Sequence, residues 1–366
     1  MDALERAKAH GNLAQQRLHN QRLAGTPVAT PEEVVARLGA VQAQDYPAAL
    51  WALGLRTRDA TAAMVEAACT AGTILRTHVM RPTWHFVAPA DIRWLLALTA
   101  PRVKALLAYY DRKLEVDATL LARSTAVLIQ ALQGGRQLTR TELGARLQHA
   151  GIATTNLQRL GQLMMHAELD GLLCSGARRG KQFTYALLDE RVPPAPALTR
   201  EEALAALTRR YFTGHGPATL KDFGWWSGLA AADVKAGLDM VQSQLVPAVV
   251  AGQTYWQAAP LPTVSDPAPT VYLLPNFDEY GVGYSDRSAI VDPTRTGAVD
   301  PKRPIYLGQM LVLGGQIVGS WQRVVGAGTV MVTKQTHTPF SAAETAAFAA
   351  AAQRYGAFLG LPVHLA

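Results

Sequence analysis

Hydrophobic and polar positions follow two different periods along the chain, and these periods succeed each other in a repeated order. Segments with apolar residues three or four positions apart predict short amphipathic helices. Each group of two or three such helices is followed by two segments that alternate every second residue, which predicts a hairpin of two strands. Helices followed by a hairpin is the order of a winged-helix domain, and the chain shows it three times.

The middle copy of this pattern is the clearest. Thr139 and Glu142 form a capping-box signature, and Leu143 and Leu147 lie four positions apart on the helix that it opens. A second helix is predicted over residues 156–170. We expect one face of it to be apolar and the other polar, with Leu157, Leu160, Met164 and Ala167 on the first and Gln158, Arg159, Gln162 and His166 on the second.

The hairpin of the middle copy has a basic tip. Strands are predicted over residues 172–175 and 182–188, and Arg178, Arg179 and Lys181 lie in the turn between them. In a winged helix the second helix can enter the major groove of DNA while the hairpin lies on neighbouring phosphates. The alternative is a winged helix that serves only packing or protein contacts.

The other two copies lie on either side. The first has predicted helices at 15–23, 30–38 and 60–71, strands at 74–80 and 83–87 joined by Arg81-Pro82, and further helices within 89–133. The third has predicted helices at 201–212, 219–226 and 231–241 and strands at 245–250 and 254–257. Its wing is short and uncharged, so we interpret the third copy as scaffold.

The C-terminal part changes to strands. These are predicted at 271–274, 305–313, 316–323 and 329–334, with Gly314-Gly315 between two of them and a closing helix at 341–355. Proline-rich linkers are predicted at 193–196 and 260–269. We therefore expect an α+β fold of tandem winged-helix domains with a C-terminal β-barrel-like domain, divided as 1–134, 135–192, 198–258 and 259–366.

Composition and charge limit the class of protein to which this chain can belong. The 366 residues are 49% hydrophobic and 17% charged, which excludes a disordered chain. Of the net charge of +7, residues 1–190 carry +6, with 22 basic and 16 acidic residues. Arginine outnumbers lysine by 27 to 8, and its planar fork suits phosphate. The excess indicates a polyanionic partner, although a codon bias toward arginine explains it equally well.

Several kinds of protein are disfavoured by missing motifs. There is no apolar leader and no run long enough for a membrane span. Cys69 and Cys174 are far apart, the nine histidines show no metal-ligand spacing, and P-loop, GxGxxG and GxSxG motifs are missing. We expect a cytoplasmic, nucleoid-associated protein without metal or cofactor.

The segment with candidate chemistry is Gln42-Ala43-Gln44, followed by Asp45. If the segment is extended, Gln42 and Gln44 point the same way and Asp45 points away. Two amides that converge on one point can hold a water molecule through donor and acceptor contacts at any pH. A Gln-x-Gln pattern by itself is a weak signal, because glutamine pairs are common.

Four stretches taken together resemble the AlkZ/YcaQ family of bacterial DNA glycosylases. They are residues 38–44, 76–85 (Arg-Thr-His-Val-Met-Arg-Pro-Thr-Trp-His), 215–226, and 276–287 with Asn-Phe-Asp-Glu-Tyr and Gly-Tyr-Ser-Asp-Arg. The resemblance covers most of the chain and implies tandem winged helices with a β-barrel. Gln42-Ala43-Gln44 matches the catalytic Gln-x-Gln of the azinomycin-resistance branch, not the Gln-x-Asp of the other. Arg81-Pro82-Thr83 departs from the Arg-Gly-Thr of many members, which puts lesion preference in question.

The resemblance implies a chemistry that suits neutral glutamines. An N7-alkylated purine is cationic, so its glycosidic bond is already weak and the base leaves neutral without a general acid, unlike the two-carboxylate scheme of other glycosidases. The enzyme would place a water molecule beneath the anomeric carbon, and Gln42 and Gln44 would hold it. The implied partner is double-stranded DNA that contains alkylated bases, in monoadducts and possible interstrand crosslinks, bound by a monomer.

Two further groups have two interpretations each. Arg81, Thr83 and His85, with Arg76 and His78 on the facing strand, form either a basic strip on DNA or a solvated face over a core of Trp84 and Phe86. Arg159 and the wing cations complete the candidate DNA contacts. For Asp278 and Glu279 we favour a structural role, bracing the barrel by pairing with Arg287. The alternative for the whole chain is a winged-helix DNA-binding regulator without chemistry.

Overall fold

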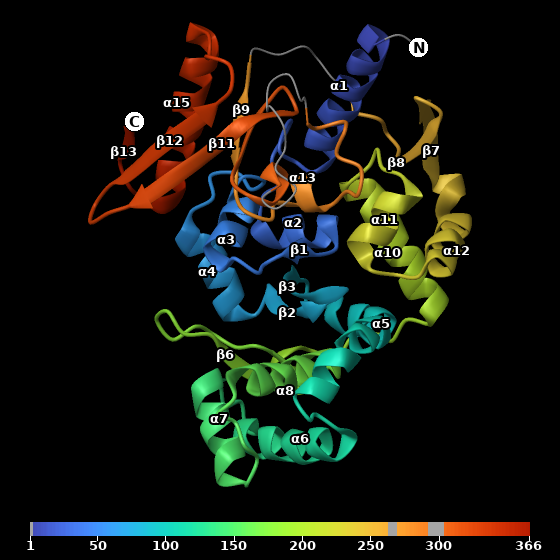
Figure 1. Ribbon diagram of the computed structural model, residues 1–366, viewed down its shortest axis with the longest axis vertical. Coiled ribbons are helices and arrows are strands. Elements are labelled where there is room, and N and C mark those ends of the chain that lie inside the picture. The colour runs from blue at the N-terminus through green and yellow to red at the C-terminus, as the bar shows by residue number, and fades with distance from the viewer. Residues whose placement is uncertain (1–2, 263–268, 292–303) are drawn as a thin grey trace. The chain divides into compact units, whose positions relative to one another are not determined.

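The computed structural model describes residues 3–262, 269–291 and 304–366. These form two compact units (Figure 1). Unit one takes its residues from Met1–Glu66, Ala205–Trp226 and Ala230–Ala366, and unit two from Ala67–Leu204 and Ser227–Leu229. Helices and sheets mix in both, which confirms the expected α+β class. The four-part division predicted from the sequence is finer than these units and stays a prediction.

Unit two contains the middle winged helix. Its sheet has the order β4-β6-β5, and three helices pack with it. The elements are α6 (Ala118–Leu132), β4 (Leu138–Thr139), α7 (Arg140–His149), α8 (Leu157–Leu169), β5 (Leu173–Ser175) and β6 (Thr184–Leu187). The predicted capping box is present, because Thr139 Oγ1 accepts from Glu142 N at 3.3 Å and Glu142 Oε2 accepts from Thr139 N at 2.7 Å. Such a cap stabilises a helix by about 1 kcal/mol.

Unit two also contains the first hairpin. Strands β2 (Leu75–Val79) and β3 (Arg81–Val87) pair antiparallel, and α5 (Ile92–Lys113) follows them. Helix α4 (Ala62–Ala71) enters this unit from unit one, and α9 (Leu188–Arg191) follows β6. The tip of the hairpin is Met80, whose φ is +62°, so the turn predicted at Arg81-Pro82 lies one residue earlier.

The N-terminal part of unit one is helical. Its elements are α1 (Ala3–Asn20), α2 (Pro31–Leu38), the two-residue strand β1 (Val41–Gln42) and α3 (Tyr46–Gly54). Thr30 caps α2 and Pro31 is its first residue, as the sequence predicts. The sequence did not predict α3, although Asp45 is its N-cap and Pro47 lies in its first turn.

The third winged helix follows the predicted order closely. Helices α10 (Arg200–Gly214), α11 (Leu220–Ser227) and α12 (Ala231–Val241) lead through a 3-10 turn, η1 (Gln242–Gln244), to strands β7 (Leu245–Val250) and β8 (Gln253–Ala258). Ala251 and Gly252 join the strands with φ angles of +53° and +78°. These angles are those of a two-residue hairpin turn whose twist matches the strands.

The C-terminal sheet is curled and has the order β13-β12-β11-β10-β9. Its strands are β9 (Val271–Leu274), β10 (Met310–Leu313), β11 (Gln316–Val325), β12 (Val330–Thr336) and β13 (Val363–Leu365), of which β13 alone pairs parallel. The strand predicted from residue 305 begins only at Met310, because residues 305–307 form a 3-10 turn, η2 (Ile305–Leu307). Residues 263–268 of the predicted linker at 260–269 lie outside the described part of the chain.

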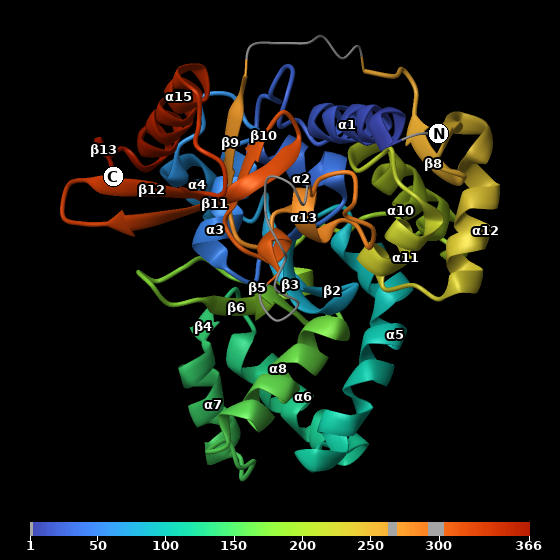
Figure 2. The same cartoon turned by 45° about the horizontal axis from the view of Figure 1, so that its top comes forward.

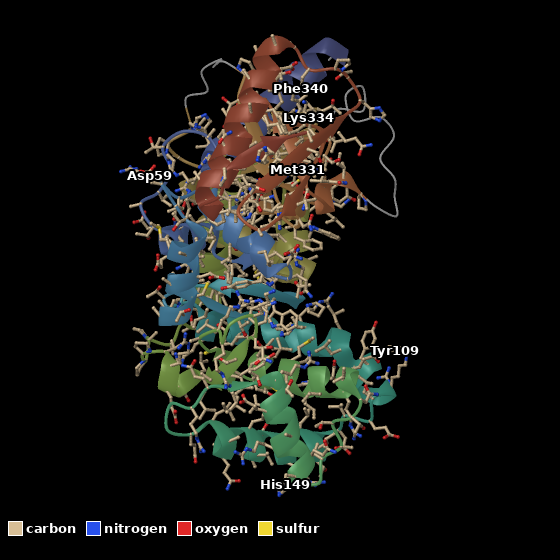
Figure 3. All side chains as sticks on the ribbon, turned by 90° about the vertical axis from the view of Figure 1, so that its left-hand side faces the viewer. Asp59, Tyr109, His149, Met331, Lys334 and Phe340 are labelled. Atoms are coloured by element: carbon tan, nitrogen blue, oxygen red, sulfur yellow. The ribbon has the colours of Figure 1, made fainter. Side chains whose placement is uncertain are left out.

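Helix α15 (Ala342–Leu359) lies along this sheet (Figure 2). Its Tyr355 and Phe358 rings lie 4.9 Å and 5.0 Å from the ring of Trp51 on α3, and Trp51 Nε1 donates to Leu273 O at 2.7 Å. Lys334 of β12 is labelled in Figure 3. Its Nζ lies 4.7 Å from the ring centroid of Phe348 of α15. The sheet, α15 and α3 thus form one core, which supports the segment that follows β1.

Candidate active site and nucleic-acid interface

The glutamine pair lies in unit one, between α2 and α3. Gln42 ends β1, and Gln44 lies in a bend that leads to Asp45 (φ −94°, ψ 99°), the cap of α3. Val41 and Ala43 are fully buried, whereas Gln42 is half-buried and Gln44 is exposed. The two glutamines are thus the more open residues of this segment, although the extended geometry expected from the sequence ends at Gln42.

A buried carboxylate fixes the backbone at the first glutamine. Glu279, in the short helix α13 (Glu279–Val282), is completely buried, and its Oε1 accepts from Gln42 N at 2.8 Å. Its Oε2 accepts from Trp226 Nε1 at 2.8 Å and lies 3.1 Å from His215 Nε2. Hydrogen bonds to a charged group stabilise by about 1.5–3 kcal/mol each. The position of the glutamine segment is therefore set by packing and by a fixed charge.

We expect Glu279→Gln to reduce glycosylase activity on alkylated DNA about 10-fold or more while leaving DNA affinity within about twofold. The substituted amide would present an N–H group to one of its present donors, so the hold on Gln42 weakens by a charge-assisted hydrogen bond. Single-turnover cleavage rates and equilibrium binding of the same duplex separate the two effects. Glu190→Gln, an exposed position in unit two, is the control, and an unchanged rate for Glu279→Gln would rule out the positioning role.

The acid next to the glutamines has a structural role. Asp45 Oδ1 accepts from Ala48 N at 3.2 Å, which caps α3. Its Oδ2 accepts from Asn276 Nδ2 at 3.1 Å, in the loop after β9. One carboxylate oxygen thus caps α3, and the other connects the end of the glutamine segment to the 276–287 stretch.

The arginine that pairs with Asp278 is Arg56, so the expected pairing with Arg287 is wrong for this residue. Arg56 Nη1 and Nη2 lie 2.9 Å and 2.8 Å from the two Asp278 oxygens, and both side chains are buried. Arg287 instead donates to Gly281 O and Ser285 O at 3.0 Å and 3.1 Å and stacks on Tyr306 at 3.9 Å. The bracing role expected for Asp278 holds, but its partner comes from the end of α3, 222 positions away in sequence.

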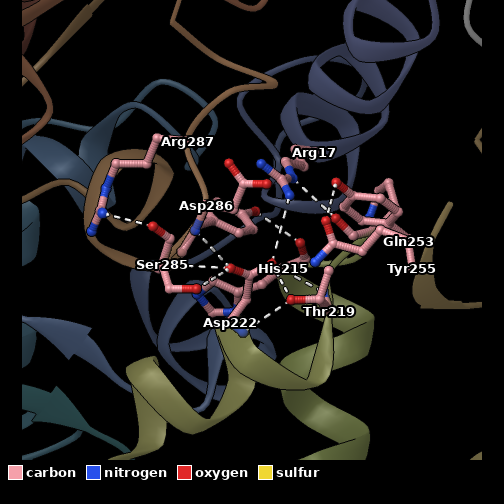
Figure 4. Close-up of polar contacts among 12 residues, drawn as sticks. Arg17, His215, Thr219, Asp222, Gln253, Tyr255, Ser285, Asp286 and Arg287 are labelled. Atoms are coloured by element: carbon pink, nitrogen blue, oxygen red, sulfur yellow. Dashed lines mark hydrogen bonds and ion pairs between the residues drawn. The ribbon is translucent and has the colours of Figure 1, made fainter. Parts of the chain in front are cut away.

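A second buried acid organises the same region. Asp222 Oδ1 accepts from Ser285 N, Ser285 Oγ and Asp286 N at 2.9 to 3.0 Å, and its Oδ2 accepts from Thr219 N and Oγ1 (Figure 4). Arg17 Nη2 lies 3.9 Å from the same Oδ2. The turn before α11 and the stretch after α13 are thereby joined, which accounts for the hydroxyl group of Ser285 in the 276–287 motif.

The register of the first hairpin corrects the expected basic strip. Arg76 pairs with Phe86 and His78 with Trp84, whereas His85 pairs with Thr77. Paired residues lie on the same face of a sheet and neighbours on opposite faces. Arg76 and His78 therefore lie on the face opposite to Arg81, Thr83 and His85, and the five residues do not form one strip. Neither interpretation from the sequence, a basic strip on DNA or a solvated face over a core of Trp84 and Phe86, describes both faces of this hairpin.

Arg76 and His78 belong to a stack of rings in unit two. The Arg76 guanidinium carbon lies 4.3 Å from the Trp84 ring and 4.5 Å from the Phe183 ring, and the His78 ring lies 4.2 Å from Trp84. His78 Nδ1 is 2.5 Å from Glu168 Oε2, and both side chains are buried. Cation–π contacts of this kind contribute about 0.5–1 kcal/mol each. The stack joins the hairpin to the wing and to α8.

On the other face, His85 orients Arg81. His85 is buried, its Nδ1 donates to Thr83 O at 3.0 Å, and its Nε2 lies 3.4 Å from Arg81 Nη2. Because a carbonyl oxygen only accepts, the proton is on Nδ1 and Nε2 can accept from Arg81. Arg81 and Thr83 are half-buried.

The expected polar face of α8 is only partly open. Gln162 and His166 are buried, and both bind Asp111 Oδ1 of α5, at 2.5 Å and 2.9 Å. Leu157, predicted on the apolar face, is 72% exposed in the first turn of the helix. The polar face is thus partly used for packing against α5, and the apolar face is not buried over its whole length. Arg159 is half-buried and donates to Glu115 O at 3.2 Å.

The wing cations differ in their surroundings. Arg179 Nη1 donates to Glu142 Oε1 at 3.1 Å, and its Nη2 contacts the other oxygen of Glu142. This bond, followed by those from Thr139, lowers the pKa of Glu142 to about 2. Arg178 lies 5.2 Å from the Phe183 ring, and Lys181 is exposed. Arg179 thus links the wing to the capping box of α7 in addition to its predicted contact with phosphate.

Sequence reasoning missed the supporting residues Arg56, His215 and Trp226. His215 and Trp226 were noted only as parts of motifs, and nothing local indicates that their ring nitrogens meet Glu279. The usable signal in the sequence was the adjacent acid pair Asp278-Glu279 between two aromatic residues. In the residues that the structure describes, no helix is long and apolar enough to cross a membrane. Over the same residues, no group of three or more potential metal ligands comes together.

Comparison with known proteins supplies the family. A model of the family described as DNA glycosylase AlkZ-like matches residues 35–358. The Interstrand DNA cross-link repair glycosylase of Streptomyces sahachiroi is 25% identical over 325 residues, which are 84% of this chain and 86% of that protein. The structure of Streptomyces sahachiroi DNA glycosylase AlkZ superposes with a TM-score of 0.78 at 23% identity, covering 97% of this chain and 99% of that one.

The tandem helix-and-hairpin fold and the family match define the chain as a DNA glycosylase, an enzyme that removes bases from DNA. It belongs to the AlkZ-like family. The resemblance noted from its motifs is thus confirmed over most of its length.

Proposed function

We propose that this DNA glycosylase hydrolyses the N-glycosidic bond of cationic N7-alkylated purines in double-stranded DNA. The observation that carries the proposal is the glutamine segment itself. Gln42 and Gln44 are the more open residues of a short segment between α2 and α3, and the buried Glu279 fixes the backbone of this segment at Gln42. A pair of neutral amides held in a fixed place is suited to orienting a water molecule and unsuited to protonating a leaving group.

The proposed reaction balances without a protein acid or base. The bond between the sugar anomeric carbon and the purine nitrogen breaks, and its electron pair leaves with the cationic base, which becomes neutral. Water adds to the anomeric carbon and loses its proton to solvent. Gln42 and Gln44 orient the water, and nearby DNA phosphates stabilise the oxocarbenium ion. Positioning of this kind contributes several kcal/mol, up to about 7–11 in model reactions.

The proposed DNA contacts come from unit two. They are Arg76, Arg81, Thr83, His85, Arg159, Arg178, Arg179 and Lys181, with a monomer bound to the duplex. Their surroundings suggest different contributions: Lys181 is exposed and suited to direct phosphate contact, whereas the buried His85 would act by orienting Arg81. The name of the Streptomyces sahachiroi relative refers to interstrand crosslinks, so the proposal includes crosslinked purines as substrates.

The test is incubation with a duplex that contains a single N7-methylguanine, or a nitrogen-mustard crosslink, followed by hot alkali. We expect strand breakage at the lesion, since the abasic site left by a glycosylase is cleaved by alkali. An undamaged duplex of the same sequence is the control. Gel retardation without breakage on either substrate would reject the proposal in favour of a protein that only binds DNA.

A further inference from the structure

A cavity of about 420 Å³ in unit one has basic walls. It lies where α1 ends, beside the last turn of α2, and the end of α10 and the segment after β8 close it. Its lining includes the guanidinium groups of Arg22 and Arg37 and the imidazole of His19, and Thr26 and Thr213 add hydroxyl groups. None of the described residues that line it carries a carboxylate.

Arg22 occupies a conformation that is unfavourable for an arginine. It follows the last turn of α1 with a φ of +60°, and its N–H group donates to His19 O at 3.0 Å. The left-handed region costs a non-glycine residue about 1–2 kcal/mol, and glycine or asparagine is usual at this place after a helix. Residues held in such conformations cluster at ligand-binding sites. The left-handed conformation of Arg22 therefore indicates that its side chain has a function.

The guanidinium groups have unused donors. Arg37 is held in place by donating from Nε to Asn20 O at 2.9 Å and from Nη2 to Thr213 O at 3.4 Å. In Arg22 the Nε atom is buried, and it has no hydrogen-bond partner in the described part of the chain. A buried N–H group without a partner costs about 1–3 kcal/mol. A ligand that accepts from Arg22 would remove this cost.

The positive charges of Arg22 and Arg37 have no acidic partner among the lining residues that the structure describes. Burial, followed by the charge of Arg22, lowers the pKa of Arg37 to about 10. The same two causes, in the same order, lower the pKa of His19. The two half-buried guanidinium groups thus repel each other, and His19 beside them favours its neutral form, around a space that an anion can enter. Arginine forks match the geometry of phosphate oxygens in particular.

We propose that His19, Arg22 and Arg37 form a binding site for one phosphate group. The source that we favour is the backbone of the DNA substrate, and this part of the inference rests on the proposed function. A free phosphate compound has the same chemistry and would bind the same atoms. In either case Arg22 and Arg37 hold the phosphate oxygens and the hydroxyl of Thr26 lies at the rim.

The test measures binding, not cleavage. Affinity for an undamaged duplex is determined over a series of salt concentrations for the full chain, for Arg22→Gln and for Arg22→Gln combined with Arg37→Gln. Each lost phosphate contact reduces the slope of log K against log salt by about 0.9, so the variants should be less steep by about 1. Arg58→Gln removes an exposed arginine of the same unit that has no part in the cavity and should keep the wild-type slope.

A second arm identifies the source of the phosphate. Inorganic phosphate, at constant ionic strength, should raise the Tm of the wild-type chain and leave that of Arg22→Gln unchanged. Loss of the phosphate effect with an unchanged DNA slope would support the site and assign it to free phosphate. No change in either arm would overturn it. Arg22→Lys keeps the charge and should retain the slope, which separates loss of the site from misfolding.

The result is independent of catalysis. If the wild-type chain cleaves N7-methylguanine DNA while the variants match the wild type both in DNA binding and in the effect of phosphate on Tm, the phosphate site is wrong and the proposed function stands. If the slope changes as expected but no lesion is cleaved, the site stands and the proposed function is wrong.

Discussion

Gln44→Ala should release N7-methylguanine from duplex DNA about 10²-fold more slowly than the wild-type chain under single-turnover conditions. This is the loss typical of removing one positioned polar group from an active site. Gln44 is exposed, in a segment whose backbone is already fixed through Gln42 N and the cap of α3. The substitution therefore removes the amide of an exposed side chain, and the free energy of unfolding should change by no more than about 1 kcal/mol.

The loss should appear in the rate alone. Affinity for the same duplex should stay within about twofold of the wild type, because the amide is proposed to hold water and not a phosphate. Gln42→Ala should show a loss of similar size, and the double variant should lose little more, since residues that act as a unit are strongly non-additive. Equal rates for Gln44→Ala and the wild type would reject the assignment of this pair.

One control variant and one further substitution at Gln44 test whether the amide itself causes the loss of rate. Gln353→Ala removes an exposed glutamine from α15 in the same unit and should leave the rate unchanged. Gln44→Glu keeps the length of the side chain but adds a group that titrates near pH 4.3. Its activity should therefore depend on pH in the acidic range, where the wild-type amides give no such dependence. A wild-type rate that already falls with protonation of one group would indicate an acid or base in place of the glutamines.

Local signals in the sequence were sufficient for most of the elements. The caps at Thr30, Thr139 and Ser341 bind within three positions of themselves, so their patterns can be recognised without the fold. The wing strands of the third copy are likewise set by the two-residue turn at Ala251-Gly252. Helix α3 has a local signal as well, because a proline in its first turn after an aspartate cap is typical of a helix start.

The residues that share one face of a strand, and the partners that side chains bind, were harder to predict than the helices and strands themselves. A strand alternates with a period of two, so the position of the hairpin tip decides which residues share a face. The tip at Met80 pairs Arg76 with Phe86, and this separates Arg76 from His85. Long-range contacts leave no local trace at all: Gln42 and Glu279 are 237 positions apart, and their hydrogen bond depends on the whole of unit one. The glutamine pair was recognised from its family motif, but its support was visible only in the structure.

The second large effect concerns the buried pair that supports the 276–287 stretch. We expect Asp278→Ala to lower the free energy of unfolding by about 3–5 kcal/mol, the usual cost of leaving one member of a buried ion pair alone. Asp278 accepts two hydrogen bonds from Arg56 and one from Tyr280 N, all within 2.9 Å. All five N–H groups of Arg56 donate hydrogen bonds. The three that do not bind Asp278 donate to Gln21 O, Gln21 Oε1 and Ala52 O.

The position of this pair explains why the effect should be large. Arg56 and Asp278 are both about 1% exposed, so water cannot replace the lost partner. Removing the carboxylate leaves a guanidinium charge in the interior, and removing the cap of α13 also disturbs the residue next to it, Glu279. We therefore expect reduced activity at temperatures well below unfolding, through the same bond to Gln42 N that Glu279 provides.

An exposed ion pair gives the matched control. Arg93 and Asp189 lie 2.8 Å apart, as close as the buried pair, but their side chains are 30% and 88% exposed. Asp189→Ala should cost no more than about 1 kcal/mol, because water and salt screen such pairs. Urea denaturation followed by tryptophan fluorescence measures both variants, and Trp51 and Trp226 report on unit one. Similar losses for the two variants would mean that burial does not set the strength of the Arg56–Asp278 pair, and that the 276–287 stretch is held by its other contacts.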